Sequence, residues 1–514
     1  MKRPRTGEEQ AYRRITGTLR RLFRQDRGAT AADITAATAL PLSTVRELLP
    51  RAADEYSGRL QVTESGEILY SFPRGFRSRY RGFRAVLSRC REKAAVCLLA
   101  VFSLVFKIWI MMMLVGYFAL FMLIALASLA LSVVAAGSSN SGGRSGRNGG
   151  GRSGRNGGFF FAESIFHLVI RLWFYSELTS AHGGGTSRRG TSRPGSSRPL
   201  HKCIFSFVFG EEDPNRGWAS REKKAIIAYL QSHSGIMALP EFMALTGLSP
   251  DRAEEEILAF SGEFGGMPEA SPGGTVIYRF DEILKGSVNA GKDSNAARPG
   301  TCGAEITAPV KRLRIFSSNK KNVNTWFVLI NGINLLFGSY FLYNAATTGP
   351  ILTPAGFEES SYVYALVTRF LLRVTADPRS VIAIGLGIVP LVFSILFWLI
   401  PAFRLAALRR ENGAIKLENF RKRAFSLIWE KPAGFRETDI TERAEECSPE
   451  NRSAACDRVI KDMGAYSMPD VEIADKGGTV YNFTALETER EILEKCRAGV
   501  KDRGLGKTVF DSDL

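Results

Sequence analysis

The chain has 514 residues, of which 45% are hydrophobic, and it carries a formal net charge of +17 with a pI near 9.6. The length leaves room for several domains, and the charge is typical both of nucleic-acid-binding proteins and of membrane proteins with basic cytoplasmic flanks. The seven cysteines are scattered, with no Cys-x-x-Cys pair and no histidine at metal-ligand spacing. Neither a disulfide framework nor a zinc site is indicated, and we expect no cofactor.

A short pattern occurs three times along the chain. Residues 66–72 read GEILYSF, residues 274–280 read GTVIYRF, and residues 478–483 read GTVYNF, which is one residue shorter. The same offset between the first two copies also aligns Leu40 with Leu248, whereas the third copy is looser. Self-similarity of this kind indicates copies of one module, each about 60 residues long.

The first copy ends a series of predicted helices and strands. The charged N-terminus lacks the apolar core of a cleavable signal peptide, so this part is expected in the cytoplasm. Helical periodicity, a capping box at Thr44 and Glu47, and alternating apolar residues around a turn predict three helices followed by two strands. The predicted elements are helices over 10–25, around Asp33–Ala37 and from Thr44, and strands over 60–63 and 68–72. This order is typical of a small winged helix-turn-helix.

The other two copies repeat this order. The third helix of the second copy begins at Ser249-Pro250-Asp251, where a hydroxyl N-cap, a proline and an early acid are typical of a helix start. The first helix of the third copy is predicted near 424–429. We therefore predict three small α+β winged-helix-like cytoplasmic modules: 1–93 with a basic arm, 201–310 with a linker, and 404–514 with a C-terminal tail.

Between the modules lie apolar runs that a membrane explains. Residues 94–136 contain one charge, Lys107, and are about twice as long as the ~20 residues that one span needs. We predict a transmembrane hairpin with its reversal near Gly116 and Tyr117. An interfacial helix up to Lys107 followed by one span is the alternative. Two further transmembrane helices are predicted over 325–345 and 381–400.

Basic residues flank the predicted spans on one side. They occur over 311–321 and 404–423 around the second pair of spans, and over 89–93 and 144–155 around the first apolar run. Because positively charged flanks stay in the cytoplasm, all three modules are expected on that side. The predicted fold class is a multi-pass α-helical membrane protein in the cytoplasmic (inner) membrane.

The linker over 137–200 is rich in Gly, Arg and Ser around one apolar segment. Residues 159–178 carry Glu163, His167 and Arg171 at intervals of four, which places them on one face of a helix. That face could line a proton path. We favour an interfacial helix with this polar face in water, because flexible polar tracts bracket the segment.

Catalytic motifs are missing from the sequence. It has no Gly-rich phosphate loop, no His-Glu-x-x-His, no Gly-x-Ser-x-Gly and no dinucleotide fingerprint, so we do not expect an enzyme. Asn331 and Asn334 lie in a predicted span, where amide side chains either bind a solute or join helices. A transporter or transporter subunit is therefore one hypothesis.

The predicted third helices differ in charge, which bears on nucleic-acid binding. In the second module this helix carries four acids against Arg252, and in the third the charges are mixed. Only the first module, with Arg46 and Arg51, has the basic surface that DNA phosphates require. The favoured hypothesis is a scaffold or sensor that binds cytoplasmic protein partners, and the alternative is a membrane-tethered transcriptional regulator.

The order of these parts resembles an uncharacterised multi-pass membrane protein family of bacteria and plastids. The likeness spans about residues 30–430 and includes the Gly-x-Ile-x-Tyr-x-Phe ending, the Gly-rich tract, and Phe205–Gly210 leading to Asp213-Pro214-Asn215. Plant members carry an iron–sulfur cluster biosynthesis label. This chain has no cysteine cluster for that role, and the resemblance implies topology rather than catalytic residues.

Overall fold

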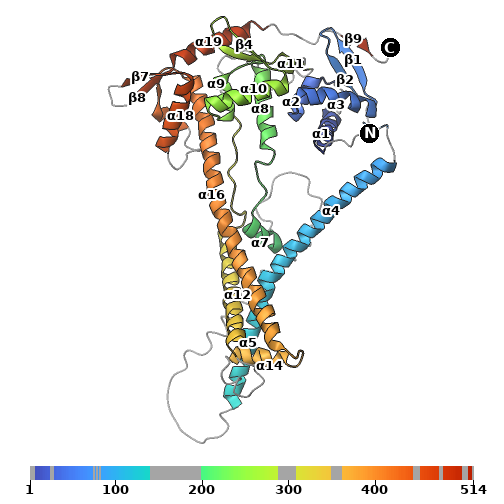
Figure 1. The fold of residues 1–514 in the computed structure, drawn as a ribbon, viewed down its shortest axis with the longest axis vertical. Coiled ribbons are helices and arrows are strands. Elements are labelled where there is room, and N and C mark those ends of the chain that lie inside the picture. The colour runs from blue at the N-terminus through green and yellow to red at the C-terminus, as the bar shows by residue number, and fades with distance from the viewer. Residues whose placement is uncertain are drawn as a thin grey trace. The chain divides into compact units, whose positions relative to one another are not determined.

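The computed structural model of the chain is mostly helical, with three small sheets (Figure 1). It divides into two compact units, one of residues 1–87, 213–313 and 410–514 and one of residues 88–212 and 314–409. The structure describes residues 6–22, 28–72, 76, 79, 83–138, 198–286, 308–348, 362–443, 452–473, 479–500 and 508–511.

The first module comprises helices α1 (Thr6–Leu22), α2 (Ala31–Thr38) and α3 (Leu42–Glu55) and strands β1 (Arg59–Thr63) and β2 (Ile68–Ser71). One face of each helix is apolar, and these faces enclose a core that includes Ile15, Ile34, Val45 and Tyr70. The capping box lies at Thr30 and Asp33, where it starts α2. The box predicted at Thr44 and Glu47 is not formed, because α3 begins earlier, after Pro41.

The second module also has three helices followed by two strands, and it adds a strand after its first helix and a short helix at its end. It contains α8 (Trp218–Ser232), β3 (Ile236–Ala238), α9 (Leu239–Thr246), α10 (Pro250–Phe264), β4 (Met267–Ala270), β5 (Val276–Arg279) and α11 (Asp281–Leu284). Its sheet is antiparallel with the order β3-β5-β4. As predicted, a Ser-Pro-Asp start opens α10, with proline at its first position, but the Ser249 hydroxyl makes no capping hydrogen bond.

The third module uses the end of a long helix as its first helix. It contains the last turns of α16 (Val389–Glu430), β6 (Phe435–Arg436), α17 (Glu437–Arg443), α18 (Arg452–Tyr466), β7 (Asp470–Ile473), β8 (Thr479–Asn482) and α19 (Thr484–Ala498). The sheet order β6-β8-β7 matches that of the second module. The last strand, β9 (Thr508–Asp511), pairs instead with β1 of the first module (Figure 1).

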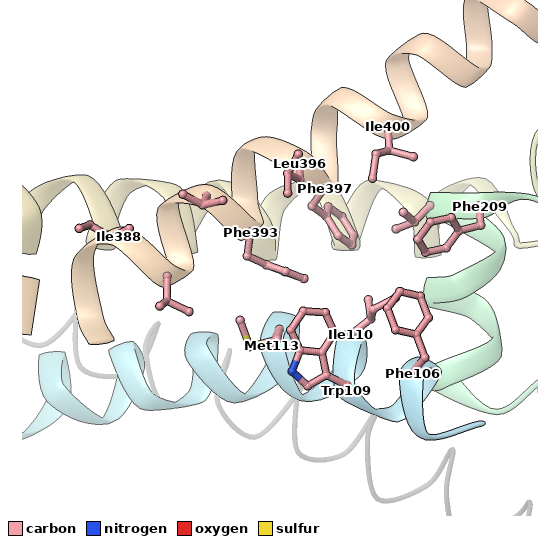
Figure 2. Close-up of a pocket in the computed structure, with 13 residues that line it drawn as sticks. Phe106, Trp109, Ile110, Met113, Phe209, Ile388, Phe393, Leu396, Phe397 and Ile400 are labelled. Atoms are coloured by element: carbon pink, nitrogen blue, oxygen red, sulfur yellow. The ribbon is translucent and has the colours of Figure 1, made fainter. Parts of the chain in front are cut away.

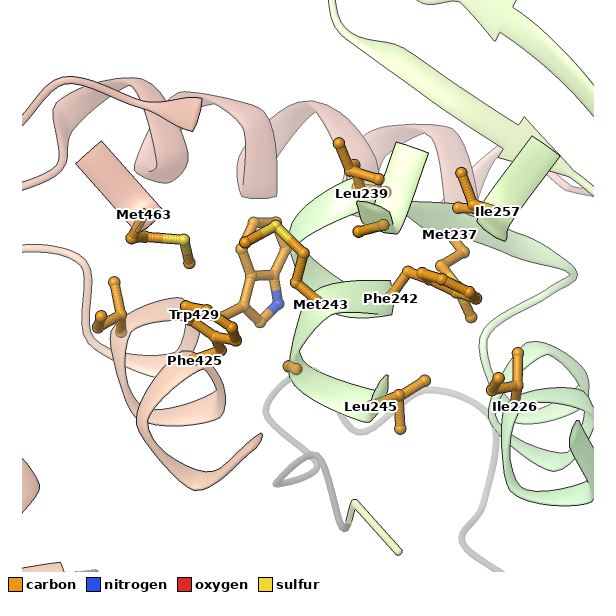
Figure 3. Close-up of a cluster of buried hydrophobic side chains, with 14 of the residues drawn as sticks. Ile226, Met237, Leu239, Phe242, Met243, Leu245, Ile257, Phe425, Trp429 and Met463 are labelled. Carbon is orange, nitrogen blue, oxygen red and sulfur yellow. The ribbon is translucent and has the colours of Figure 1, made fainter. Parts of the chain in front are cut away.

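One apolar core runs through the second and third modules. The cluster joins Phe242 and Met243 of α9, Phe425 and Trp429 of α16, and Met463 of α18 (Figure 3). The aromatic residue that ends each recurring pattern is buried as well, at Phe72, Phe280 and Phe483. These two modules therefore share one hydrophobic interior rather than being separate beads.

The second unit is built from long apolar helices. They are α4 (Phe83–Met111), the π-helical turn η2 (Met112–Gly116), α5 (Tyr117–Ser138), α7 (Leu200–Phe209), α12 (Lys321–Thr347), α14 (Tyr362–Leu371), α15 (Pro378–Val381), the π-helical turn η4 (Ile382–Ile388) and the first part of α16. Among the described residues, three helical stretches are long and apolar enough to cross a membrane: 97–133, 321–347 and 378–430.

The hairpin predicted over 94–136 needs correction. α4, η2 and α5 follow one another without a loop, so this part of the chain does not reverse at Gly116 and Tyr117. The run contains no turn-forming Pro, Asn or Asp, and helical hydrogen bonding satisfies the backbone in apolar surroundings. Gly116 is accommodated by a π-helical turn instead.

The boundary predicted at residue 404 also differs from the structure. The span predicted over 381–400 and the helix predicted near 424–429 belong to one continuous helix, α16, which has Pro401 inside it. The interfacial helix predicted over 159–178 lies outside the described residues.

Candidate functional site

The third helices of the modules pack against one another in the first unit. α10 contacts α3 on one side and α18 on the other. Leu42, the first residue of α3, lies close to Gly265 at the end of α10. In winged-helix proteins that read DNA, this helix enters the major groove. Here each third helix has another third helix as a neighbour.

Both basic residues predicted to bind nucleic acid have partners within the first unit. Arg46 forms an ion pair with Glu282 of α11, and Arg51 lies 3.7 Å from Glu8 with its guanidinium 5.0 Å from the ring centre of Tyr12. Burial alone would raise the pKa of Glu282. The hydrogen bond from Lys285 and the charges of Lys285 and Arg46 outweigh this effect, so the pKa lies below its usual value.

The two-stranded ribbons, or wings, expose apolar side chains. The outer strands β4 and β7 are exposed along their whole length, and among the described residues no strand pairs with their outer edges. Met468 and Ile473 beside and within β7 are 88% and 85% exposed. Unpaired strand edges with exposed apolar residues are sites for pairing with another chain.

The first module shows what such an edge accepts. Strand β9 pairs antiparallel with the outer edge of β1, with Gln61 opposite Asp511, and Gln61 Nε2 donates to Asp511 Oδ2 at 2.7 Å. A segment distant in sequence therefore completes this wing as a third strand, which is the geometry of β-augmentation.

A buried polar cluster joins the second and third modules. Glu241 of α9 is 1% exposed and accepts hydrogen bonds from Tyr229 (2.7 Å), from the Ala238 amide (3.2 Å) and from Arg497 of α19 (2.7 Å). Burial raises the pKa of Tyr229 well above its ordinary value, and burial lowers the pKa of His233, which stacks on that ring.

A second carboxyl group is buried in α19. Tyr466 donates to Glu489 at 2.9 Å. Burial raises the pKa of Glu489 to about 7, and the charge of Glu241 adds to this rise although the Tyr466 hydrogen bond opposes it. The carboxyl group therefore changes charge near neutral pH.

A buried lysine holds α16 against the second module. The Lys422 side chain is 1% exposed, and its ammonium lies 2.8 Å from Glu222, 3.3 Å from Glu418 and 4.8 Å from the ring centre of Trp218. Charge pairing and a cation–π contact replace its water shell. The sequence showed Lys422 only as one of several basic flank residues, because its burial depends on Trp218 and Glu222, which are distant in the sequence.

In the second unit, Asn331 and Asn334 join helices. Asn331 Nδ2 donates to the Ser394 carbonyl of α16 at 2.9 Å, and Asn334 Nδ2 donates to the Leu114 carbonyl of η2 at 2.8 Å. Both side chains are fully buried, and their Oδ1 atoms have no partner among the described residues. The π-helical turns offer carbonyls that α-helical bonding would occupy, and Tyr117 similarly donates to Gly385 in η4.

The remaining predicted site residues, Glu163, His167 and Arg171, lie outside the described residues. Within the described ranges, no group of three or more His, Cys, Asp or Glu side chains is placed to hold a metal ion.

Comparison with known proteins gives one informative similarity. The chain is 22% identical over 418 residues to an uncharacterized chloroplastic protein of Arabidopsis thaliana. The aligned region covers 79% of this chain and 71% of that protein. No protein-family model matches the chain, and no solved structure matches it. The similarity agrees with the expected likeness to an uncharacterised plastid protein and carries no iron–sulfur role.

Proposed function

We propose that the chain is a multi-pass membrane protein whose three winged-helix-like modules form one platform for protein partners. The observation that carries this proposal is the packing of α10 against both α3 and α18. Helices that would read DNA are directed at neighbouring modules, while the wings remain exposed. A platform of this kind binds partners through its wings.

The charges of the third helices favour a protein partner over DNA. Arg46 and Arg51 are engaged with Glu282 and Glu8. Phosphate binding would have to displace these pairs, and the acids of α10 would repel the DNA backbone beside them. The regulator hypothesis therefore requires a rearrangement of the first unit.

The wing edges of β4 and β7 are the proposed contact points. β9 on β1 is the precedent for strand addition to a wing of this chain. Main-chain hydrogen bonds along an edge strand give affinity, and apolar side chains such as Ile473 give specificity.

The packing of the modules supports one location for all of them. Two apolar helices, α12 and α16, separate the second and third modules, and an even number of crossings returns the chain to the same side of a membrane. Between the first two modules the described residues supply one candidate crossing. For both modules to lie on the same side, the total number of membrane crossings in that part of the chain must be even.

The face carrying the basic flanks is the proposed side, by the positive-inside rule. It is the cytoplasmic face of a bacterial inner membrane. The chloroplastic label of the Arabidopsis relative favours the corresponding stromal face if this chain acts in a plastid.

Site-specific photo-crosslinking tests the platform. A benzophenone amino acid is placed at Met267 and at Ile473 in the full chain, and at Leu258 of α10 as an exposed apolar control away from the wings. Irradiation of membranes is expected to give a discrete protein adduct from the wing positions and not from Leu258.

Two outcomes would contradict the platform. Equal labelling at Leu258 and the wings would remove the role of the strand edges. Retention of duplex DNA by the detergent-purified full chain, falling steeply with salt and without wing adducts, would support the regulator hypothesis instead.

A further inference from the structure

A groove in the second unit is lined by apolar side chains from three helical segments (Figure 2). Its volume is about 430 Å³, within the range of ~300–1,000 Å³ found for ligand pockets. The rings of Trp109 and Phe393 in its wall make an edge-to-face contact, with ring centres 6.5 Å apart. The wall residues come from α4 and η2 (Phe106, Trp109, Ile110, Met113), from α7 (Val208, Phe209) and from η4 and α16 (Ile388, Val389, Val392, Phe393, Leu396, Phe397, Ile400).

The length of the groove matches one leaflet of a bilayer. Its wall on η4 and α16 extends from Ile388 to Ile400, which corresponds to about 18 Å at ~1.5 Å per residue. Half of a hydrocarbon core is about 15 Å thick. Because Trp109, Val392 and Leu396 are exposed at its side, the groove is open along its length. This shape suits one extended acyl chain lying along the helices.

Lys107 lies at the α7 end of the groove. Lys107 follows the wall residue Phe106, and its ammonium is 4.5 Å from the ring centre of Phe205, which in turn contacts Phe209 of the wall. Among the described residues no carboxylate forms an ion pair with Lys107. It is the only charge in residues 94–136, and the opposite end of the groove has none in its wall.

Arg404 is near the same end but is already used by the protein. Its guanidinium donates to the carbonyls of Ser206, Phe207 and Phe316 and lies 4.2 Å from the ring centre of Phe316. It fixes the C-terminal end of α7. Of Arg404 and Lys107, only Lys107 therefore remains for a ligand.

We propose that this groove binds one acyl chain of an anionic phospholipid, with the headgroup phosphate at Lys107. The apolar wall holds the tail by contact area, and the ammonium selects the negative headgroup. This inference does not depend on the proposed partner platform, because it uses residues of the second unit only.

Fluorescence quenching by brominated lipid tests the site. The detergent-purified full chain is titrated with phosphatidylglycerol carrying dibrominated acyl chains, at low mole fraction in the micelle. The fluorescence of wild type minus that of Trp109→Phe reports the quenching of Trp109 alone. Saturable quenching is expected, half-complete at a mole fraction at least fivefold lower than with brominated phosphatidylcholine.

A matched pair of variants tests occupation of the groove. Val392 and Ile395 lie on α16 and are similarly exposed, at 48% and 47%, but only Val392 lines the groove. Val392→Phe is expected to weaken the Trp109 quenching at least fivefold, whereas Ile395→Phe leaves it unchanged. Equal effects of Val392→Phe and Ile395→Phe on the quenching would show that Trp109 contacts only bulk lipid. Quenching that rises linearly with the brominated lipid, without saturation, would show the same. Either result would overturn the proposal.

A second pair tests the headgroup. Lys107→Gln is expected to reduce the preference for phosphatidylglycerol to that for phosphatidylcholine, and Lys107→Arg to retain it. Arg369→Gln, which removes a cation that is not beside the groove, is the control. Equal binding of a brominated free fatty acid in wild type and Lys107→Gln would refute the headgroup assignment. Protection of Trp109 from every lipid would point to a protein helix in the groove and would also refute it.

Discussion

Arg497 Nη2 lies 2.7 Å from Oε2 of Glu241 and so ties α19 to the second module. The same guanidinium nitrogen donates to the Ile236 carbonyl at 2.8 Å. Both partners are largely buried, at 16% and 1% side-chain exposure. The platform therefore depends on a charged contact that neither module makes alone.

Loss of this contact should destabilise the first unit. Arg497→Met leaves Glu241 buried without its cation, and removing one partner of a buried pair costs about 3–5 kcal/mol. We expect the unfolding free energy of the full chain in detergent to fall by this amount in chemical denaturation.

The matched control is Lys495→Met, which removes an exposed charge from the same helix. It should change the unfolding free energy by less than about 0.5 kcal/mol. The double variant Glu241→Gln with Arg497→Met should recover part of the loss, because position 241 then carries no charge that needs the cation. Equal effects of Arg497→Met and Lys495→Met would refute the role of the pair.

The raised pKa of Glu489 makes stability depend on pH. Its folded value of about 7 lies above the usual 4.5, so the folded state favours the protonated form. The destabilisation from this group is absent below pH 4.5, grows as the pH rises from 4.5 to about 7, and then stays constant. A shift of this size corresponds to up to about 3 kcal/mol.

Unfolding of wild type and Glu489→Gln between pH 5 and 8 measures this effect. We expect wild type to lose stability relative to Glu489→Gln as the pH rises across that range. His233, whose pKa is lowered by burial, contributes to both proteins and cancels in the difference. A difference that does not vary with pH would contradict the assignment to Glu489.

The two buried amides should act through helix packing. Asn334→Leu removes the bond to Leu114 and Asn331→Leu the bond to Ser394. Such interhelical bonds are worth about 0.6–1.7 kcal/mol in membrane proteins. Each variant should therefore lower the melting temperature of the purified chain, whereas Thr325→Val, whose hydroxyl bonds within its own helix, should not. Unchanged melting together with lost uptake of a solute would favour the transporter hypothesis.

Local patterns were sufficient to predict most elements of the three modules. The recurring pattern at 66–72, 274–280 and 478–483 correctly marked a returning strand and a buried terminal aromatic residue. The helix starting at Pro250 followed from the proline at its first position and the acid of its first turn. These features depend on neighbours in the sequence, which is why one sequence suffices for them.

Contacts between distant segments were not predictable in this way. Nothing in residues 508–511 indicates pairing with β1, and the charge pattern alone cannot show that Arg46 meets Glu282. The basic flank at 421–423 was read as a membrane-orientation signal, although Arg421 pairs with Asp462 and Lys422 is buried. The reversal predicted at Gly116 failed because a glycine in an apolar helix need not end it.

The packing of the three modules in one unit makes a prediction about topology. Single cysteines are placed at Ser65, Glu269 and Glu472 on the three wings and at Arg373, which follows α14 between the two candidate spans α12 and α16, in a cysteine-free chain. All four positions are exposed.

A membrane-impermeant maleimide on intact cells should label only the Arg373→Cys variant, and inverted membrane vesicles should give the opposite result. The reason is that modules packed in one unit must lie on one side, while a connection between two spans lies on the other. Labelling of Ser65→Cys together with Arg373→Cys would place the first module apart from the second. That result would contradict the ion pair between Arg46 and Glu282 and the platform that depends on it.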